Sequence, residues 1–396
     1  MSRLRLSVFN TQPPHLYFGG VERRIVETGK RMRGEVQTTV YSGTKAGFRK
    51  PKEIDGIEIV PVFSTDTLYP LDNWSFNHAA SRLVDIEGPD VFEAHAVSGY
   101  GFQRKLRKQK SRKPFIHTVH GVLADEYFQA LRIGSLSLRG KLANLVLWRL
   151  SKQEAECARN ANLVVTISNY SLQKLVRFYD VDSSKIRIVP NGVDPQRFKP
   201  SEEDTVLKKQ IGVGNRPVIL FVGRLIPRKG LQYLVEAARV VVRERKDVVF
   251  LIVGNGPLRN HLVKSIKTSD LSSNFILFGD ANEAVLPAIY NCADIFVLPS
   301  IQEGQGIALL EAQSSGKPVV AFNIGGVREA LQNQLTGLLT EPNSLDLAET
   351  LLRLLADKSL REKMGRRGRD FVSRNLSWDA CARKMVEIYR ESQQLV

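Results

Sequence analysis

Residues 217–254 read PVILFVGRLIPRKGLQYLVEAARVVVRERKDVVFLIVG, and this stretch decides the fold. It opens with a continuous apolar run in PVILFVGR and closes with a second one in VVFLIVG, as expected for strands buried on both faces of a parallel sheet. Between them, GLQYLVEAARVVVRER carries apolar residues at helical spacing. A strand, a helix and a strand in this order predict a right-handed βαβ unit.

The same alternation continues toward the C-terminus. We predict strands at 274–280, 294–300 and 318–322 and helices at 258–267, 283–293, 306–316 and 327–333, followed by helix alone from about residue 345. Strict alternation of this kind indicates a doubly wound α/β domain with a parallel sheet.

The N-terminal half alternates less regularly. Apolar runs at 4–10, 37–43, 90–95, 114–121, 163–168 and 185–191 predict strands, and 19–32 predicts a helix, so a second Rossmann-like domain is expected. The segment RIVPNGVDPQRFKP, residues 187–200, is rich in turn-forming proline and glycine. We therefore expect domains at 1–192 and 193–378, with a last helix at 379–396 that is a candidate to pack back on the N-terminal domain.

Positive charge is concentrated in the first half of the chain. Of 396 residues, 43% are hydrophobic and 25% charged, which are globular values, and the formal net charge is +16. Residues 1–200 hold 31 Lys and Arg against 19 Asp and Glu, and the densest stretch, 101–150, holds 11 against 2. A basic field of this kind favours an anionic partner such as a nucleotide, a nucleic acid or an anionic lipid surface.

Cysteine use and hydropathy bear on the compartment. Cys157, Cys292 and Cys381 are far apart and show no CxxC spacing, which argues against a disulfide framework or a zinc site and fits a reducing compartment. Neither a signal peptide nor an uninterrupted apolar run of about 18 residues is evident. We therefore expect a cytoplasmic protein without a membrane-spanning segment.

Two cations follow the first strand of the C-terminal domain. In FVGRLIPRKG, Arg224 comes just past the strand end, and Lys229 stands at the entry to the next helix. Two cations and a helix N-terminus at one strand end are suited to a diphosphate. The alternative, an ordinary solvated loop, remains open from this motif alone.

A glycine loop with two glutamates follows a later strand. In EGQGIALLE, Gly304 and Gly306 allow backbone N–H groups to approach a phosphate or a sugar hydroxyl, and Glu303 precedes the loop. Glu311 lies five residues beyond Gly306, roughly 7–8 Å along a helix, which is about the step from a diphosphate to its ribose. Because an isolated buried carboxylate is costly, Glu311 within an apolar run favours binding over a solvated helix face.

These segments together carry a family resemblance over nearly the whole chain. FVGRLIPRKG, GNGPL, ADIFVLPS, EGQGIALLEAQSSGKPVVAFNIGGVREAL, TGLL and IVPNGVDPQRFKP resemble the GT4-type retaining glycosyltransferases (glycosyltransferase group 1). The resemblance implies the GT-B fold, in which two Rossmann-like doubly wound domains face a central cleft. The N-terminal domain would then lie on the acceptor side, and the C-terminal domain would bind the nucleotide-sugar donor.

The resemblance also implies roles for individual residues. Arg224 and Lys229 would hold the donor diphosphate, Glu303 would contact the transferred sugar, and Glu311 would hold the ribose. The backbone from Gly304 through Gln305 and Gly306 to Ile307 would bind sugar and phosphate groups. The family often has an aromatic residue where this chain has Gln305, so the sugar is not inferred.

Two sites are expected in the N-terminal domain. Gly19 and Gly20 resemble the family's glycine-rich loop, whose amides would face the diphosphate or the acceptor, although alone they read better as a plain strand–helix turn. His120 ends the predicted strand HTVHG, at a position where the family places a histidine that faces the donor sugar. A lone histidine is more often structural, but the resemblance favours a catalytic role for His120, whereas His117, on the other face of that strand, is expected to be core.

The implied reaction is a glycosyl transfer of the hexosyltransferase type with retention at the anomeric carbon. The leaving diphosphate would help to deprotonate the acceptor on the same face, and catalysis would consist mainly of positioning and of charge stabilisation by Arg224, Lys229 and helix N-termini. No acidic cluster ends a predicted strand, so we expect neither a metal nor a prosthetic group, with a UDP- or GDP-linked sugar as donor.

The basic region 103–150 bears on the acceptor. QRKLRKQKSRKP is followed by an amphipathic segment in which Leu138, Leu142, Leu145 and Trp148 lie near helical spacing. One reading is a peripheral patch for an anionic membrane on its cytoplasmic face, which would favour a lipid-linked acceptor and a place in cell-envelope polysaccharide or glycolipid synthesis. The other is a solvated charge run beside a helix whose apolar face is core, with a glycan acceptor equally open.

Three alternative functions remain open from sequence. A nucleic-acid-binding protein would interleave aromatic residues with its basic run, yet here only Phe102 and Phe115 flank it, so no nucleic-acid partner is expected. A GT-B epimerase or phosphorylase would need further acid–base groups or a further phosphate site. An inactive transferase is the third alternative, against which Arg224, Lys229, Glu303 and Glu311 are all present.

Overall fold

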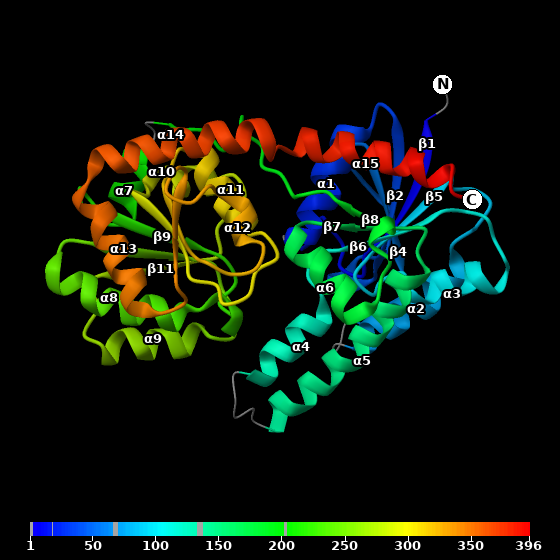
Figure 1. Ribbon diagram of the computed structural model, residues 1–396, viewed down its shortest axis with the longest axis horizontal. Helices are drawn as coiled ribbons and strands as arrows, with labels where there is room; N and C mark the ends of the chain where they lie inside the picture. The colour runs from blue at the N-terminus through cyan, green and yellow to red at the C-terminus, as the bar shows by residue number, and fades with distance from the viewer. Residues whose placement is uncertain (1–2, 18, 66–69, 133–137, 202–203) are drawn as a thin grey trace. The chain divides into compact units, whose positions relative to one another are not determined.

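The computed structural model describes residues 3–17, 19–65, 70–132, 138–201 and 204–396. The chain divides into two compact units (Figure 1). Unit 1 comprises Met1–Asn191 and Trp378–Val396, and unit 2 comprises Gly192–Ser377.

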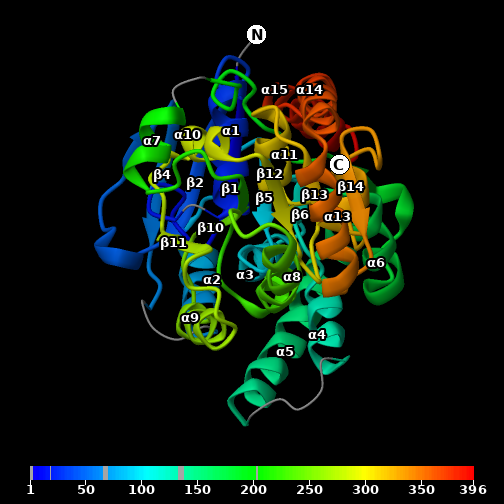
Figure 2. The ribbon, with the colours of Figure 1, turned by 90° about the vertical axis from the view of Figure 1, so that its left-hand side faces the viewer.

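Unit 2 is built on a six-stranded parallel sheet in the order β11-β10-β9-β12-β13-β14. Its strands are β9 (Val218–Val222), β10 (Val249–Val253), β11 (Phe275–Gly279), β12 (Ile295–Leu298), β13 (Val319–Phe322) and β14 (Gly337–Thr340). Its helices are α7 (Asp204–Gln210), α8 (Leu231–Glu244), α9 (Arg259–Thr268), α10 (Leu286–Cys292), α11 (Ile307–Ser314), α12 (Val327–Ala330), α13 (Ser344–Ala356) and α14 (Lys358–Asn375). Helix α8 packs against α9 and α13, whereas α11 packs against α14 and α10 against α7 (Figure 2).

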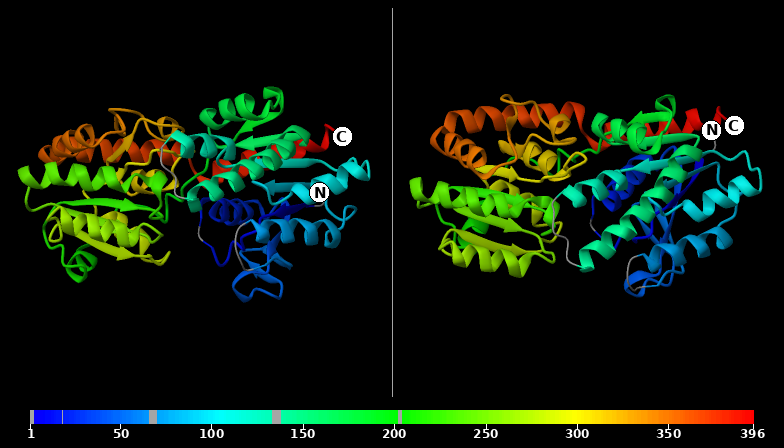
Figure 3. Two further views of the ribbon diagram at one scale, coloured as in Figure 1. Left: turned by 90° about the horizontal axis from the view of Figure 1, so that it is seen from below. Right: turned by 60° about the horizontal axis from the view of Figure 1, so that its bottom comes forward.

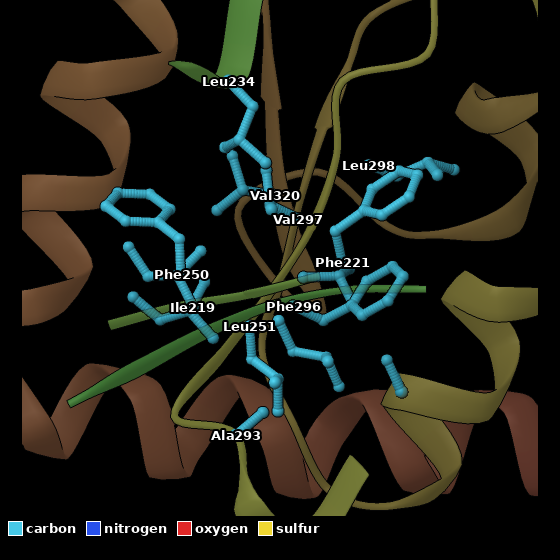
Figure 4. Close-up of a cluster of buried hydrophobic side chains, with 14 of the residues drawn as sticks. Ile219, Phe221, Leu234, Phe250, Leu251, Ala293, Phe296, Val297, Leu298 and Val320 are labelled. Atoms are coloured by element: carbon cyan, nitrogen blue, oxygen red, sulfur yellow. The ribbon is translucent and has the colours of Figure 1, made fainter. Parts of the chain in front are cut away.

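Helices on both faces explain the continuous apolar strands of unit 2. Ile219 and Phe221 of β9 and Phe250 of β10 are fully buried, and Figure 4 shows them among side chains from β12, β13 and α8. Burying a Leu- or Phe-sized side chain contributes about 1.5–3 kcal/mol, so these runs stabilise the sheet from both sides. The predicted parallel α/β domain is thereby confirmed.

Unit 1 holds an eight-stranded sheet in the order β3-β4-β2-β1-β5-β6-β7-β8, in which only the β3–β4 pair is antiparallel among the described strands. The strands are β1 (Leu4–Phe9), β2 (Val36–Gly43), β3 (Lys52–Ile54), β4 (Ile57–Val62), β5 (Val91–His95), β6 (Phe115–Val119), β7 (Leu163–Thr166) and β8 (Ile186–Ile188). The helices are α1 (Gly20–Met32), α2 (Leu71–Leu83), α3 (Tyr100–Lys108), α4 (Leu123–Arg132), α5 (Leu138–Asn160), α6 (Asn169–Tyr179) and α15 (Trp378–Gln393).

The last helix, α15, belongs to unit 1, where it packs against α1 and β5. Buried polar contacts join it to this unit. The hydroxyl of Tyr389 donates to Glu93 of β5 at 2.5 Å, and the Arg24 guanidinium lies 3.4 Å from the sulfur of Met385. Arg24 is 1% exposed and also donates to the carbonyl of Val189 at 2.8 Å. Buried charges need such partners, so these contacts fix where α15 lies.

Helices α4 and α5 pack side by side (Figures 2 and 3) and extend away from the sheet of unit 1 (Figure 1). Leu142, Leu145 and Trp148 on α5 are exposed by 64%, 59% and 43%, so they are not part of the core. The side chain of Leu138 lies outside the described residues. No helix among the described residues combines the length and the apolar character that crossing a membrane requires.

Candidate active site

The loops that follow three adjacent strands of unit 2 meet at the carboxyl edge of its sheet. After β9, the chain forms a short 3₁₀ helix, Pro227–Lys229, and the backbone N–H of Ile301 in the loop after β12 donates to the carbonyl of Arg228 at 2.9 Å. The N–H of Gly326, after β13, donates to the carbonyl of Glu303 at 3.1 Å. Because β12 lies between β9 and β13 in the sheet, the predicted basic loop and glycine loop are brought together.

Gly230 allows the basic loop to pack closely on the end of β12. Its φ is +65°, in the left-handed region, and a Cβ placed there would lie 1.9 Å from the carbonyl oxygen of Pro299. Any side chain would therefore push the loop away from this strand. The neighbouring residue, Lys229, is placed beside the loop after β12 as a result.

Lys229 and Glu303 form an ion pair in this loop cluster. The hydroxyl of Ser300 donates at 3.3 Å to the same carboxylate oxygen that Lys229 contacts, and Arg228 lies 4.0 Å from the other oxygen of Glu303. Burial alone would raise the pKa of Glu303, but Lys229 and Arg228 outweigh this effect and hold the pKa below its ordinary value. Glu303 is therefore a carboxylate at neutral pH, able to accept hydrogen bonds but not to donate one.

Arg224 behaves differently from Lys229. Its side chain is exposed, and the described part of the chain provides neither a hydrogen bond nor an ion pair to it. The structure thus brings Lys229 and Glu303 together and leaves Arg224 available to an anionic ligand.

The glycine loop leads directly into α11. Gly306 precedes the helix with a φ of +89° and a ψ of 80°, a conformation that glycine adopts readily, and Ile307 begins the helix. No side chain caps this helix start. The first N–H groups of a helix lack partners within it and carry the positive end of the helix dipole, so this turn favours an anion. Gly304 is partly exposed, whereas Gln305 is 2% exposed, so Gln305 would act here through its backbone.

Glu311 lies inside α11 and is 3% exposed. The hydroxyl of Tyr290 in α10 donates to one of its carboxylate oxygens at 2.7 Å. A buried carboxylate held in this way is oriented before a ligand arrives, which suits recognition of a pair of hydroxyls.

In unit 1, Gly19 and Gly20 form the start of α1. A Cβ on Gly19 would lie 2.3 Å from a carboxylate oxygen of Glu22, and the side-chain amide of Asn10 donates to the other oxygen of Glu22 at 3.1 Å. A carboxylate beside this loop suits a hydroxyl donor, such as a sugar, better than a phosphate group.

His120 follows β6 and is partly exposed, whereas His117 within β6 is fully buried. His95 ends the neighbouring strand β5, and its Nδ1 lies 2.9 Å from Nε2 of His120. Burial, followed by the nearby His95, lowers the pKa of His120 well below its ordinary value, so the ring is neutral at neutral pH.

Several contacts of these residues were missed from the sequence: Arg228 and Ser300 at Glu303, Tyr290 at Glu311, Glu22 at Gly19 and His95 at His120. The signal for His95 was available, because it ends a predicted strand just as His120 follows one. Among the described residues, no three His, Cys, Asp or Glu side chains are grouped so as to hold a metal ion.

Comparison with known proteins places these units in one family. The model of "Glycosyl transferases group 1" matches residues 203–371, and that of "Glycosyltransferase Family 4" matches residues 18–197. A UDP-Gal:alpha-D-GlcNAc-diphosphoundecaprenol alpha-1,3-galactosyltransferase of Escherichia coli is 33% identical over 286 residues, covering 70% of each chain.

Two further proteins extend the comparison. A GDP-mannose-dependent alpha-(1-6)-phosphatidylinositol monomannoside mannosyltransferase of Mycobacterium tuberculosis is 32% identical over 238 residues, covering 58% of this chain and 62% of the relative. Sucrose-phosphate synthase from Thermosynechococcus elongatus shares the fold, with a TM-score of 0.84 and 21% identity over 98% of this chain and 99% of the other. With two parallel-sheet units of the GT-B type, the chain belongs to the family 4 glycosyltransferases (group 1) and is a glycosyltransferase.

Proposed function

We propose that this enzyme transfers a sugar from a nucleoside-diphosphate sugar to a glycan or lipid-linked acceptor, with retention at the anomeric carbon. The observation that carries the proposal is the loop cluster of unit 2, where Lys229 and Glu303 pair beside the N-terminus of α11 and Glu311 lies within that helix. Cations, helix N–H groups and a buried carboxylate, in this order, match a diphosphate followed by a ribose.

Each side chain then has a distinct role. Arg224 is unpaired among the described residues, so it contacts the diphosphate without losing an existing interaction. Lys229 exchanges part of its interaction with Glu303 for the diphosphate, and the Glu303 carboxylate accepts hydrogen bonds from hydroxyls of the transferred sugar. Glu311, fixed by Tyr290, accepts both ribose hydroxyls.

The chemistry needs charge stabilisation rather than a protein nucleophile. As the bond from the anomeric carbon to the diphosphate breaks, negative charge grows on the leaving oxygens, and Arg224, Lys229 and the start of α11 stabilise it. The diphosphate in turn accepts the proton of the acceptor hydroxyl that attacks from the same face. This supports retention without a covalent enzyme intermediate and without a required metal.

A thermal-shift screen of the full chain against UDP, GDP, ADP and their sugar conjugates, without and with Mg²⁺, tests the donor site. The names of the two relatives point to UDP and GDP as the leading candidates. We expect one nucleotide to raise the melting temperature of the wild type. Glu311→Gln should raise the Kd of that nucleotide roughly ten- to a hundredfold and so reduce the shift, because hydrogen bonds to a charged group contribute about 1.5–3 kcal/mol.

Glu349→Gln is the matched control, since this carboxylate lies on the exposed face of α13 in the same unit. Equal loss of affinity in both variants, or no nucleotide shift in the wild type, contradicts the assignment. A product analysis that finds the inverted anomer contradicts retention.

For the acceptor, we propose that the exposed face of α5 rests on an anionic membrane surface, with the protein peripheral on the cytoplasmic side. Apolar Leu142, Leu145 and Trp148 alternate there with basic Lys141, Arg149 and Lys152, and all six are exposed. The Lys152 ammonium lies 5.4 Å from the centre of the Trp148 ring. Apolar groups that enter the headgroup region, with basic groups worth about 1 kcal/mol each near an anionic leaflet, are typical of such a surface.

Sedimentation with vesicles tests this surface. We expect binding to phosphatidylglycerol-containing vesicles but weak binding to phosphatidylcholine alone, and at least about a tenfold loss of affinity in Leu142→Ser/Leu145→Ser, since burying each leucine contributes about 1.5–3 kcal/mol. Leu345→Ser is the control, because Leu345 in α13 is equally exposed at 64%. If the wild-type protein does not bind anionic vesicles, the proposal that α5 rests on a membrane surface is wrong.

A further inference from the structure

A chain of buried polar contacts in unit 1 leads from the C-terminal helix to His120. Strands β5 and β6 pair in parallel, with His95 opposite Thr118, so the end of β5 lies beside the residue that follows β6. The rings of His95 and His120 stack with centroids 5.1 Å apart, and Nδ1 of His95 lies 2.9 Å from Nε2 of His120. One of these nitrogens must carry the hydrogen that the other accepts.

The carboxylate behind this pair belongs to Glu93, which is 2% exposed. One oxygen accepts a hydrogen bond from the hydroxyl of Thr118 and the other from the hydroxyl of Tyr389, each at 2.5 Å. The first of these oxygens also lies 3.5 Å from Nε2 of His95. Glu93 therefore accepts hydrogen bonds from Thr118 and Tyr389 and presents an oxygen close to Nε2 of His95.

This arrangement decides which nitrogen of His95 is protonated. Burial lowers the pKa of His95 to about 4, so the ring carries a single hydrogen at neutral pH. With that hydrogen on Nε2, an N–H faces the carboxylate. With it on Nδ1, a lone pair would face the carboxylate oxygen inside a buried site, which is electrostatically unfavourable. The Nε2–H form of His95 is thus favoured, and its Nδ1 is an acceptor.

The consequence passes to His120. Since Nδ1 of His95 accepts, Nε2 of His120 donates, and the neutral His120 ring keeps a lone pair on its own Nδ1. A ring nitrogen with a lone pair accepts a hydrogen bond from a hydroxyl and offers none to an oxyanion. A diphosphate, which needs donors, is a poor match for this nitrogen, whereas a sugar hydroxyl is a good one.

We propose that His95 is a positioning residue that holds His120 in the Nε2–H form, so that Nδ1 of His120 accepts a hydrogen bond from a hydroxyl of the bound sugar. The inference rests on the proposed function and on the family resemblance, which implies that a histidine at the position of His120 faces the sugar. Glu93 and Tyr389 orient His95, so the C-terminal helix supports His120 from within unit 1.

The tautomer is measured directly in the full chain labelled with ¹⁵N-histidine. The six histidines keep the long-range ¹H–¹⁵N spectrum simple, and single-histidine variants assign it. At pH 7.5 we expect both His95 and His120 in the Nε2–H form. In Glu93→Gln, whose side-chain amide can present a donor to the ring, we expect His95 to lose this strict preference. A His120 protonated on Nδ1 in the wild type overturns the proposal whatever the enzyme's activity.

Kinetics then separate positioning from simple structural support. His95→Leu should lower kcat with little change in the KM of the nucleotide sugar, by roughly 10- to 100-fold, which is about the cost of removing the hydrogen-bonding partner that orients a metal-ligating histidine. His95→Asn should recover most of the loss, because its amide oxygen lies near the place of Nδ1 and accepts from His120. If the kcat of His95→Asn is as low as that of His95→Leu, the inference is wrong.

A double-mutant cycle links the effect to His120. In a His120→Ala background, His95→Leu should cost little more, because the residue acts through His120. An undiminished cost there shows that His95 acts elsewhere and overturns the proposal. If His120→Ala is itself fully active while the spectra show the Nε2–H form, the proposed role of His120 fails, and the tautomer assignment stands apart from it.

Discussion

At the scale of single residues, the Lys229–Glu303 pair joins two motifs that lie 74 positions apart in the sequence. The side chains are 14% and 11% exposed, so the pair is weakly screened by water. The contribution of this pair to stability depends on pH in a definite direction. Because the folded pKa of Glu303 is lowered, the pair contributes stability above the unfolded pKa and loses that contribution as pH falls through the folded pKa.

We therefore expect Lys229→Met to destabilise unit 2 most at pH 7, by about 3 kcal/mol, since removing one partner leaves the other charge buried. In the variant, burial raises the pKa of Glu303, so protonation relieves the penalty. Thermal unfolding measured from pH 7 to pH 4 should show the difference from wild type shrinking toward acid pH.

Glu303→Gln supplies the matched background for this experiment. We expect the stability difference between the double variant Lys229→Met/Glu303→Gln and Glu303→Gln alone to stay constant between pH 7 and pH 4, because no carboxylate titrates at position 303. A difference that varies with pH as strongly in the double variant would mean that another group, not Glu303, carries the effect.

At the scale of secondary-structure elements, the sequence predicted strands well where both faces are buried. Strands β9, β10, β12 and β13 are short apolar runs with little polar interruption, and each was predicted from that pattern. Strand β14, with the sequence GLLT, was missed, because the overlapping stretch TGLL was treated only as a family motif.

The hairpin of β3 and β4 was also missed, for a different reason. It lies at the sheet edge, where polar residues such as Glu53 and Glu58 alternate with apolar ones and weaken the apolar run. The turn signal was present nonetheless. Asp55 and Gly56 have φ values of +52° and +83°, as a two-residue hairpin turn requires, and Asp-Gly is a preferred sequence for it.

The candidate site shows a similar division. Each motif lies within one continuous stretch of sequence, and its residue spacing indicates the ligand groups it could bind. Lys229, Glu303 and Glu311 could therefore be named from the sequence. Their partners come from other elements: Tyr290 reaches Glu311 from α10, and His95 reaches His120 from β5. Such contacts depend on strand order, which a single sequence does not reveal when the crossovers are not yet known.

At the scale of the whole molecule, the two units each hold a buried tyrosine–carboxylate contact. In unit 1, Tyr389 donates to Glu93, and in unit 2, Tyr290 donates to Glu311. The tyrosine of unit 1 comes from α15, which follows unit 2 in the chain, so unit 1 cannot complete its core until the last helix is in place. If each unit opens locally as its own cooperative body, the two contacts protect different sets of amides.

Hydrogen exchange with mass spectrometry on two Tyr→Phe variants tests this independence. Tyr389→Phe removes a hydroxyl from a buried carboxylate, at about 1–3 kcal/mol. It should speed exchange in β5, β6, α1 and α15, while β9–β14 exchange as in the wild type. Tyr290→Phe is the mirror control and should speed exchange in α10, α11 and the strands of unit 2 only. If either variant speeds exchange equally in both units, the molecule opens as one cooperative body, and α15 then couples the stability of the two units as well as completing unit 1.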